Sequence, residues 1–320
     1  PDTVLAKEAG LELGIKESIV VNDRMETSVP NIYAAGDAVQ VKHYVTGNDA
    51  LISLAGPANK QGRIIADNIC GGDSRYLGSQ GSSVIKVFDM TAATTGINET
   101  NAKKSGLEVD TVILSPMSHA GYYPGGKVMT MKVVFEKETY RLLGAQIIGY
   151  EGVDKRIDVL ATAIHAGLKA TQLKDLDLAY APPYSSAKDP VNMAGFMIDN
   201  IAKGTLKQWH LEDMDKISRD KSVVLLDVRT VGEFNRGHMG HMDGFKNIPV
   251  DELRERINEI EKGKPVYLIC QSGLRSYIAS RILEGNGYET YNFSGGFRFY
   301  DAVVNDRALI ERAYACGMDY

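Results

Sequence analysis

Cys270-Gln271-Ser272-Gly273-Leu274-Arg275-Ser276 is the stretch that brings a thiol, a cation and a tight turn together. The apolar run 266–269 before it predicts a buried strand, and the apolar spacing over 277–283 predicts a helix after it. Cys270 is therefore expected on a strand–loop–helix turn, where backbone N–H groups, the helix dipole and Arg275 would favour the thiolate over the thiol. The alternative is a small buried cysteine that ends a core strand. The C-x-x-G-x-R-S pattern favours a reactive cysteine.

Several short segments on either side of this loop form a second pattern. They are Leu225-Leu226-Asp227-Val228-Arg229, Glu233-Phe234, Gly240-His241-Met242 with Gly244, Asn247-Ile248-Pro249 and Asn292-Phe293-Ser294-Gly295-Gly296-Phe297. With them, residues 217–320 resemble a rhodanese domain, a sulfurtransferase module with an α/β fold and a parallel sheet. The resemblance implies that Cys270 carries sulfane sulfur and that Arg275 belongs to its site. Gly237-His238-Met239 precedes a copy of itself at 240–242, which predicts a longer loop here.

The length of the cysteine loop separates two chemistries. Cysteine phosphatases of related architecture place five residues between cysteine and arginine, whereas here four residues, 271–274, separate Cys270 from Arg275. The smaller ring suits a terminal persulfide sulfur better than a tetrahedral anion, so sulfur transfer is favoured. We interpret Asp227 and Arg229 as a buried pair that braces the loop rather than as reactants.

Composition narrows the class of protein. The chain has 320 residues, of which 44% are hydrophobic and 24% charged, as in ordinary soluble domains. Its net charge of -5 gives no nucleic-acid footprint, and no stretch reaches the ~18 consecutive apolar residues of a membrane span. Three cysteines make no disulfide framework. We expect a cytoplasmic protein with no metal site and no nucleic-acid or membrane partner.

The N-terminal segment carries a flavin-type pattern. Strands are predicted at 18–21 and 31–35, and Gly36-Asp37-Ala38 follows directly. The string from Thr27 to Ala38 resembles the second flavin motif of the FAD- and NAD(P)H-dependent disulfide reductases. The resemblance implies that Asp37 accepts a hydrogen bond from the ribitol chain of FAD, with Gly36 and Ala38 beside it. A helix entered through Ala55-Gly56 would direct its positive end at the flavin ring, or would simply pack closely through its small residues.

The central segment predicts an α+β unit. Its expected strands are 84–88, 111–114, 129–135 and 142–149, and its expected helices are 155–166 and 190–202. This pattern resembles the dimerisation domain of the same reductases, which implies a homodimer formed through residues 81–200.

Two strings in this unit carry tyrosines, Gly121-Tyr122-Tyr123-Pro124 and Ala179-Tyr180-Ala181-Pro182-Pro183-Tyr184-Ser185. Packing is the common role of a tyrosine. The strings, however, resemble those of coenzyme A disulfide reductases, whose paired tyrosines reach the sulfur at the partner's catalytic cysteine. By that match Tyr122 and Tyr180 are the candidates, with Tyr123 and Tyr184 as near competitors. A phenol can stabilise a leaving thiolate by donating a hydrogen bond.

The whole chain thus resembles a fused coenzyme A disulfide, persulfide or polysulfide reductase. We expect the end of an FAD-binding Rossmann-like domain at 1–80, the dimerisation domain at 81–200, a linker at 201–216 and the rhodanese domain at 217–320. The sequence has no Gly-x-Gly-x-x-Gly, and neither Cys70 nor Cys316 matches a reductase cysteine. We therefore expect the C-terminal portion of a longer protein.

The resemblance implies a flavoprotein enzyme that uses FAD and NAD(P)H to reduce a coenzyme A persulfide, a polysulfide or coenzyme A disulfide, coupled to a sulfur-carrier site at Cys270. Two alternatives stay open. One is a sulfur-carrier or sulfur-sensing adaptor in which the reductase part is a scaffold. The other is an NADH oxidase or peroxidase, against which the rhodanese segment and the tyrosine strings argue.

Overall fold

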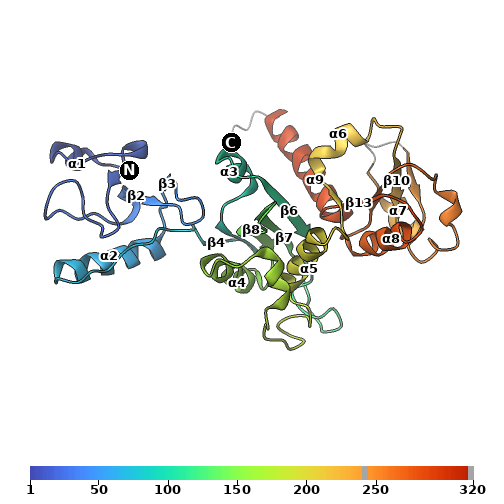
Figure 1. The fold of residues 1–320 in the computed structure, drawn as a ribbon, viewed down its shortest axis with the longest axis horizontal. Coiled ribbons are helices and arrows are strands. Elements are labelled where there is room, and N and C mark those ends of the chain that lie inside the picture. The colour runs from blue at the N-terminus through green and yellow to red at the C-terminus, as the bar shows by residue number, and fades with distance from the viewer. Residues whose placement is uncertain (240–243, 316–320) are drawn as a thin grey trace.

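The computed structural model describes residues 1–239 and 244–315. Three parts follow one another along the long axis of the molecule in chain order, as the colours in Figure 1 show. The N-terminal part ends near the strand β4, the central part is built on an antiparallel sheet, and the C-terminal part on a parallel one. The predicted combination of α/β and α+β architecture is confirmed.

The N-terminal part combines short elements around a small core of Met25, Val39 and Val41. They are the helices α1 (Val4–Glu8) and α2 (Ala55–Ile69), the 3₁₀ turns η1 (Ile15–Glu17) and η2 (Gly36–Ala38), and the strands β1 (Ile19–Val20), β2 (Val39–Lys42) and β3 (Asp49–Ala50). β2 lies between its two neighbours, parallel to β1 and antiparallel to β3.

The prediction of a strand at 31–35 is wrong. Asn31 takes a left-handed φ of 66°, and Tyr33 makes only an isolated bridge to Glu26. The partner of β1 is β2 instead, because the alternating Val39 and Val41 supply the buried face. Gly36-Asp37-Ala38 therefore forms the turn that leads into a strand, and does not follow one.

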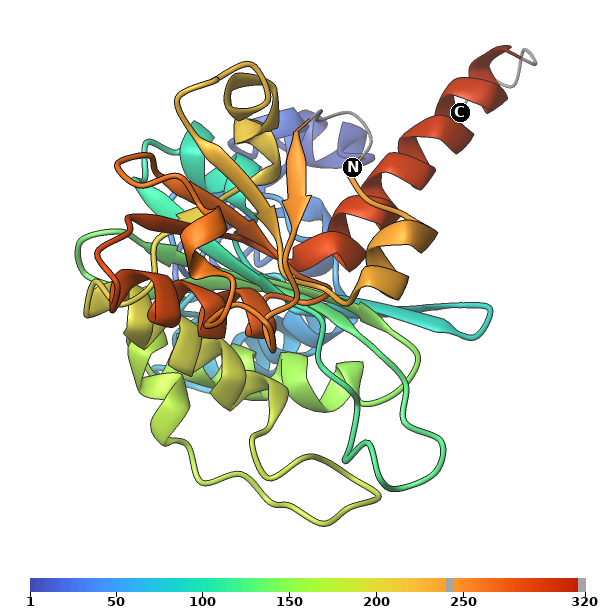
Figure 2. The same cartoon turned by 90° about the vertical axis from the view of Figure 1, so that its right-hand side faces the viewer.

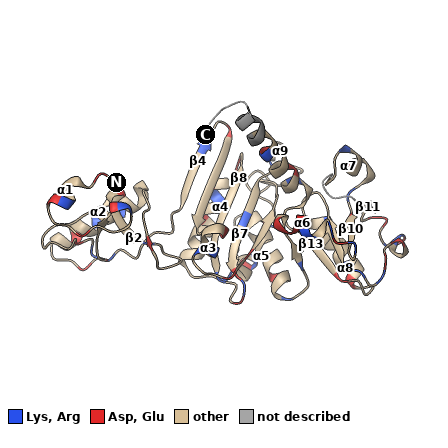
Figure 3. Cartoon of the chain, turned by 90° about the horizontal axis from the view of Figure 1, so that it is seen from above, with Lys and Arg blue, Asp and Glu red and all other residues tan. Residues whose placement is uncertain are grey.

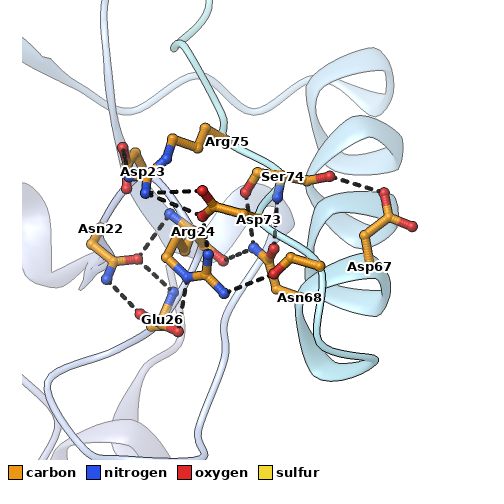
Figure 4. Close-up of polar contacts among 10 residues, drawn as sticks. Asn22, Asp23, Arg24, Glu26, Asp67, Asn68, Asp73, Ser74 and Arg75 are labelled. Atoms are coloured by element: carbon orange, nitrogen blue, oxygen red, sulfur yellow. Dashed lines mark hydrogen bonds and ion pairs between the residues drawn. The ribbon is translucent and has the colours of Figure 1, made fainter.

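A polar cluster fixes the far end of α2 (Figure 4). The Asn68 side chain donates to the carbonyls of Arg24 (3.1 Å) and Ser74 (2.9 Å), and its oxygen accepts from the Ser74 N–H (2.8 Å). Arg24 also pairs with Asp73. Because Asn68 is buried, these bonds join the turn after β1 to the segment after α2 and so orient the whole helix.

The central part is a five-stranded antiparallel sheet in the order β4-β5-β8-β7-β6. The strands are β4 (Ser83–Val87), β5 (Met90–Gly96), β6 (Val109–Leu114), β7 (Thr130–Glu136) and β8 (Leu142–Gly149). α4 (Val153–His165) packs on β5 and β8, and α5 (Pro190–Ala202) on β6, so both lie on one side of the sheet (Figure 2). α3 (Glu99–Lys104) and the 3₁₀ turn η3 (Ala170–Asp175) complete this part.

Most predicted elements of this part are confirmed, two of them with their bounds, 142–149 and 190–202. β5 and α3 were not predicted. β5 is Met-Thr-Ala-Ala-Thr-Thr-Gly, whose small and polar residues give no clear alternation of apolar side chains.

The C-terminal part is a five-stranded parallel sheet in the order β11-β10-β12-β13-β9. Its strands are β9 (Gln208–Trp209), β10 (Val224–Asp227), β11 (Phe245–Asn247), β12 (Val266–Ile269) and β13 (Thr290–Phe293). Its helices are α6 (Met214–Ile217), α7 (Val231–Arg236), α8 (Leu274–Glu284) and α9 (Gly296–Ala315), with 3₁₀ turns η4 (Leu211–Asp213) and η5 (Ile257–Glu259). β9, from the stretch 201–216 expected as a linker, is an edge strand of this sheet, and Trp209 is buried in its core.

The two sheets meet through their edge strands β6 and β9. The Gln208 side chain donates to the Thr111 carbonyl (3.2 Å), and the Ser294 hydroxyl accepts from the Ile113 N–H (3.1 Å). His210 lies 3.2 Å from the Asp110 carboxylate. Side chains of one sheet thus satisfy backbone groups on the edge of the other, which fixes their relative position.

Charge is interspersed over the elements of all three parts (Figure 3), in keeping with the small net charge. No helix in the described part of the chain is long and apolar enough to cross a membrane.

Candidate functional site

The Cys270 loop has the strand–loop–helix form that the sequence predicts. β12 ends at Ile269, Gly273 turns the chain with a left-handed φ of 97°, and α8 begins at Leu274. The Cys270 sulfur accepts hydrogen bonds from the Gly273 N–H and the Ser276 hydroxyl, each at 3.1 Å. The residue is 1% exposed. Two donors at a helix N-terminus therefore face a sulfur that the fold shields from water, an arrangement that stabilises negative charge on it.

A glycine turn holds the other side of the loop. The Phe297 N–H donates to the Cys270 carbonyl (2.8 Å), and the Arg298 N–H donates to the Gln271 carbonyl (3.1 Å). A Cβ on Gly296 would lie 2.7 Å from the Ser272 nitrogen, so only glycine allows this approach. The closing Ser-Gly-Gly-Phe of the sequence pattern thus supports the cysteine loop directly.

The sequence pattern placed Arg275 at the Cys270 sulfur, but its side chain binds Glu233 instead. Its guanidinium forms two bonds to Glu233, at 2.7 and 2.8 Å, and its charge reaches Cys270 only through space. The hydrogen bonds from Arg275 hold the pKa of Glu233 at about 2, well below its usual range. The direct donors to sulfur are Gly273 and Ser276, and Arg275 ties α8 to α7.

Glu233 and Ser276 are site residues to which sequence reasoning gave no role. Thr230 caps α7 and accepts from the Glu233 N–H, while the Glu233 carboxylate accepts from the Thr230 N–H (3.0 Å). The Thr-x-x-Glu spacing of this capping box was the available signal. Ser276 directly follows Arg275, but its contact with sulfur depends on the first turn of α8.

Asp227 and Arg229 form the buried pair that was expected to brace the loop. Each is 1% exposed, and the Arg229 guanidinium donates to Asp227 Oδ1 (3.1 Å) and to Asp227 Oδ2 (2.6 Å). The Arg229 guanidinium carbon lies over the Phe297 ring, 4.0 Å from the ring centre. The pair thus contacts the glycine turn rather than the sulfur. The repeated Gly240-His241-Met242 and Cys316 lie outside the described residues.

The two tyrosine strings meet in space. The hydroxyls of Tyr122 and Tyr180 are 2.6 Å apart, although the residues are 58 positions apart in the chain. The hydrogen bond between the two hydroxyls raises the pKa of Tyr180 above its ordinary value. Tyr123 instead packs edge-on against His119, with ring centres 5.6 Å apart. The geometry therefore favours Tyr122 and Tyr180 over the competing tyrosines.

The pair lies beside a cavity of about 600 Å³ between α4 and the second tyrosine string. Tyr180 and Tyr184 form part of its wall, together with His119 and Lys155. Both hydroxyl-bearing side chains are open to solvent, Tyr122 at 76% and Tyr180 at 45% exposure. The two phenols can therefore be approached by a ligand or by another surface.

The flavin-type residues form a second group at the start of α2. Gly36 has a left-handed φ of 81°, and its N–H donates to the buried Gln61 of α2 (2.7 Å). This bond places the exposed Asp37 and the neighbouring Ala38 beside the helix. Gln61 is a supporting residue that the sequence did not single out.

The N-terminal end of α2 is open. Leu54 at its N-cap makes no side-chain capping bond, and Ala55 and Gly56 are exposed. The free N–H groups and the positive dipole end of this fifteen-residue helix can therefore bind a polar or anionic ligand group. A carboxylate acceptor, a backbone turn without Cβ and a helix N-terminus fit the hydroxyl-rich chain and the ring of FAD.

The arrangement defines a class of protein: a reductase-type α+β unit joined to a flavin-type segment and to a rhodanese-type cysteine loop. The model of the pyridine nucleotide-disulphide oxidoreductases matches residues 1–62, that of their dimerisation domain matches 82–190, and that of the rhodanese-like domain matches 210–302. The chain belongs to the pyridine nucleotide-disulphide oxidoreductases and carries a rhodanese-like domain.

Solved structures and a curated relative agree with this assignment. Reduced CoADR-RHD of Bacillus anthracis is 47% identical, with a TM-score of 0.92 over 96% of this chain and 55% of that one. The NAD-dependent persulfide reductase of A. fulgidus is 41% identical, with a TM-score of 0.84 over 94% and 54%. The CoA-dependent NAD(P)H sulfur oxidoreductase of Pyrococcus furiosus is 40% identical over 60% of this chain and 43% of that protein. The chain thus spans about half the length of the relatives it matches.

Proposed function

We propose that this protein is a flavoprotein oxidoreductase that uses NAD(P)H to reduce a coenzyme A persulfide, a polysulfide or coenzyme A disulfide. The observation that carries the proposal is the 2.6 Å contact between the Tyr122 and Tyr180 hydroxyls on a reductase-type dimerisation domain. The names of the similar proteins, which include persulfide and sulfur reductases, support the choice of substrates.

The tyrosine pair is suited to the cleavage of a sulfur–sulfur bond. One phenol donates its hydrogen to the other, whose own hydrogen is then free to point at an approaching sulfur. The inner hydrogen bond strengthens the outer one, because chains of hydrogen bonds polarise one another. The pair can therefore stabilise the thiolate that leaves when the bond breaks.

The flavin-type group would hold FAD, with Asp37 accepting from a ribitol hydroxyl and Gly36 and Ala38 beside it. Bound FAD supplies the transfer of electrons from NAD(P)H to a disulfide. The free N–H groups at Ala55 and Gly56 would stabilise negative charge on the ring, and Gln61 holds the turn in place.

The rhodanese-type loop would carry sulfane sulfur on Cys270. The Gly273 N–H and the Ser276 hydroxyl, which contact the cysteine sulfur, are placed to stabilise a thiolate or persulfide anion. In this proposal Cys270 exchanges sulfur with the small-molecule carrier. The reductase cysteine that the family resemblance implies, itself reduced by FAD, would attack the sulfur–sulfur bond, and the tyrosine pair would stabilise the thiolate that leaves.

The assembly is also part of the proposal. We propose a homodimer formed through residues 81–200, in which the exposed tyrosines of one protomer face the reductase site of its partner. The cytoplasmic location and the domain limits at 80 and 200 are proposed on the sequence arguments given above, whereas the limit expected at 217 moves ahead of β9, which belongs to the parallel sheet.

The flavin spectrum of the full-length protein tests the proposal. We expect a yellow protein whose flavin absorbance is bleached by NAD(P)H and restored by coenzyme A persulfide, polysulfide or coenzyme A disulfide. Comparison of the three oxidants at equal concentration identifies the preferred one. A colourless protein that still acquires sulfur on Cys270 would favour the adaptor alternative instead.

A further inference from the structure

The contact between Tyr122 and Tyr180 needs an anchor, because the two phenols are exposed and cannot be held by burial. They lie on segments that form turns and irregular backbone between β6 and β7 and between η3 and α5. One backbone bond joins these segments directly, from the Ala120 N–H to the Ser185 carbonyl (2.9 Å). Flexible loops with exposed tips lose such alignment readily unless something fixed lies beneath them.

Arg156 of α4 lies beneath both segments. It is 1% exposed, and its Nη2 donates to the Ser118 carbonyl (2.9 Å) of the first segment. The same nitrogen contacts the Ser185 hydroxyl (3.1 Å) and the Tyr184 carbonyl (3.4 Å) of the second. One guanidinium therefore binds the bases of both tyrosine loops.

The charge of Arg156 is balanced inside the same cluster. Asp189 is 2% exposed and accepts from Nε (3.2 Å) and Nη2 (3.0 Å) of Arg156. Its second oxygen accepts from the Val191 N–H (3.0 Å) at the start of α5. The buried ion pair thus links both loops to two helices that pack on the central sheet.

The backbone before α4 is shaped around this guanidinium. The Gly152 carbonyl accepts from Nη1 (3.1 Å), and a Cβ on Gly152 would lie 2.0 Å from that nitrogen. A lysine at position 156 has neither the five donors nor the planar fork that reach these acceptors together.

We infer that Arg156 is a positioning residue for sulfur-bond cleavage: it binds the bases of both tyrosine loops and so keeps the Tyr122 and Tyr180 hydroxyls in contact. The inference rests on the proposed function, which gives the tyrosine pair its chemical role. Arg156 itself touches neither phenol hydroxyl in this arrangement and acts through the backbone of the loops.

A double-mutant cycle in the full-length holoenzyme tests the inference. Arg156→Lys should slow oxidation of the reduced flavin by the sulfur substrate about 10- to 100-fold, the size expected when a catalytic group is misplaced. In the Tyr122→Phe/Tyr180→Phe background the same substitution should change the rate less than about twofold, because the group it positions is already gone. Flavin reduction by NAD(P)H should be unchanged. Equal losses in both backgrounds would overturn the inference.

A second readout separates this inference from the proposed function. The hydrogen bond between the two hydroxyls raises the pKa of Tyr180, so loosening the loops should lower that pKa toward its ordinary value. Phenolate absorbance measures it, after subtraction of the titration of the matching Tyr180→Phe protein. An unchanged titration in Arg156→Lys sinks the inference. An unchanged rate of sulfur-bond cleavage in Tyr122→Phe/Tyr180→Phe would contradict the proposed role of the tyrosines. The titration would still test whether Arg156 holds the two loops together.

Two further variants distinguish loss of the anchor from loss of the fold. Circular dichroism shows whether each variant is folded. Ser185→Ala removes one acceptor of Arg156 and leaves the ion pair with Asp189, so it should shift the Tyr180 titration in the same direction by a smaller amount. Arg141→Lys is the matched control, since Arg141 lies in the same part of the chain but bonds to the Val45 carbonyl (3.5 Å) and pairs with Glu136 instead of binding a tyrosine loop. A titration shift in Arg141→Lys as large as that of Arg156→Lys would overturn the inference in favour of an effect common to arginine-to-lysine exchanges.

Discussion

The cysteine loop and the tyrosine pair are built in opposite ways. The sulfur of Cys270 is buried, and its donors Gly273 and Ser276 are three and six residues away in the chain. The hydroxyls of Tyr122 and Tyr180 are exposed and come from loops 58 residues apart. The first site is a local backbone turn backed by a sheet, whereas the second is a long-range contact that depends on the support below it.

This difference predicts which substitutions disrupt each site. A local turn fails when the reacting residue itself is replaced, because the strand and helix on either side hold the rest of the loop. A contact between two distant loops can also fail through a residue that supports the loops from below, such as Arg156. The exposed pair further needs a covering surface to exclude water during reduction, which a second protomer would supply in the proposed homodimer.

The largest expected effect is at the local site. Cys270→Ser should abolish persulfide formation from thiosulfate or polysulfide, because a serine hydroxyl stays protonated near neutral pH and is a far weaker nucleophile. Reduction of a small disulfide with NAD(P)H should be largely unaffected. Mass spectrometry of the chain after incubation with a sulfane donor, beside an NAD(P)H-consumption assay, measures both. Added sulfur that persists and maps to Cys70 or Cys316 would place the sulfur chemistry on another residue.

The tyrosine pair should give the converse result. Tyr122→Phe with Tyr180→Phe should slow sulfur-bond cleavage by about 100-fold, the range for loss of a donor to developing negative charge. Flavin reduction by NAD(P)H and sulfur loading of Cys270 should be nearly unchanged. Stopped-flow measurement of the two half-reactions tests this expectation. A similar loss in both half-reactions would mean that the tyrosines are packing residues.

The flavin-type group provides an intermediate case, since Asp37 is exposed but is held by the turn that Gln61 anchors. Asp37→Ala removes a charged acceptor for a ribitol hydroxyl and should weaken FAD binding by roughly 1.5–3 kcal/mol, or about 10- to 100-fold. The dissociation constant of FAD in the full-length protein, measured after dialysis, is the test. Asp67→Ala at the far end of the same helix is a control that should retain the flavin. Full occupancy in Asp37→Ala would contradict the assignment.

The smallest expected effect concerns the support of the cysteine loop. Glu233 has a pKa of about 2 because of its hydrogen bonds from Arg275, against an ordinary value of 4.5. Its contribution to stability is therefore fully present above about pH 4.5 and is lost as the pH falls toward about 2. Glu233→Gln should cost about 1–2 kcal/mol near neutral pH, reduced by the partial exposure of the pair.

Denaturation followed by the fluorescence of Trp209 measures this effect, since the chain has one tryptophan and it is buried in the rhodanese-like core. The difference between wild type and Glu233→Gln should shrink as the pH is lowered through this window. Glu259→Gln, which breaks an exposed pair with Arg256, should change stability little. A pH-independent difference for Glu233→Gln would show that the carboxylate charge does not stabilise the loop.

Much of the fold was predictable because its strands and helices follow local patterns. The apolar run of 142–149 and the helix 190–202 were found with their bounds. The errors occurred where partner choice decides the structure. Residues 31–35 have strand-like composition, yet β2 supplies the better buried face and pairs with β1. Gln208 and Trp209 look like part of a linker until they complete the parallel sheet.

The residue types of the three candidate sites could be read from the sequence alone. They are a cysteine separated from an arginine by four residues, a Gly-Asp-Ala turn and two tyrosine strings, and they can be recognised because local turns and caps depend on neighbours in the chain. Which of these groups meet in space depends on the three-dimensional packing. Arg275 binds Glu233 of another helix, and Tyr122 meets Tyr180 above Arg156. Such contacts depend on how distant segments pack on a common sheet, and no local period in the sequence encodes that packing.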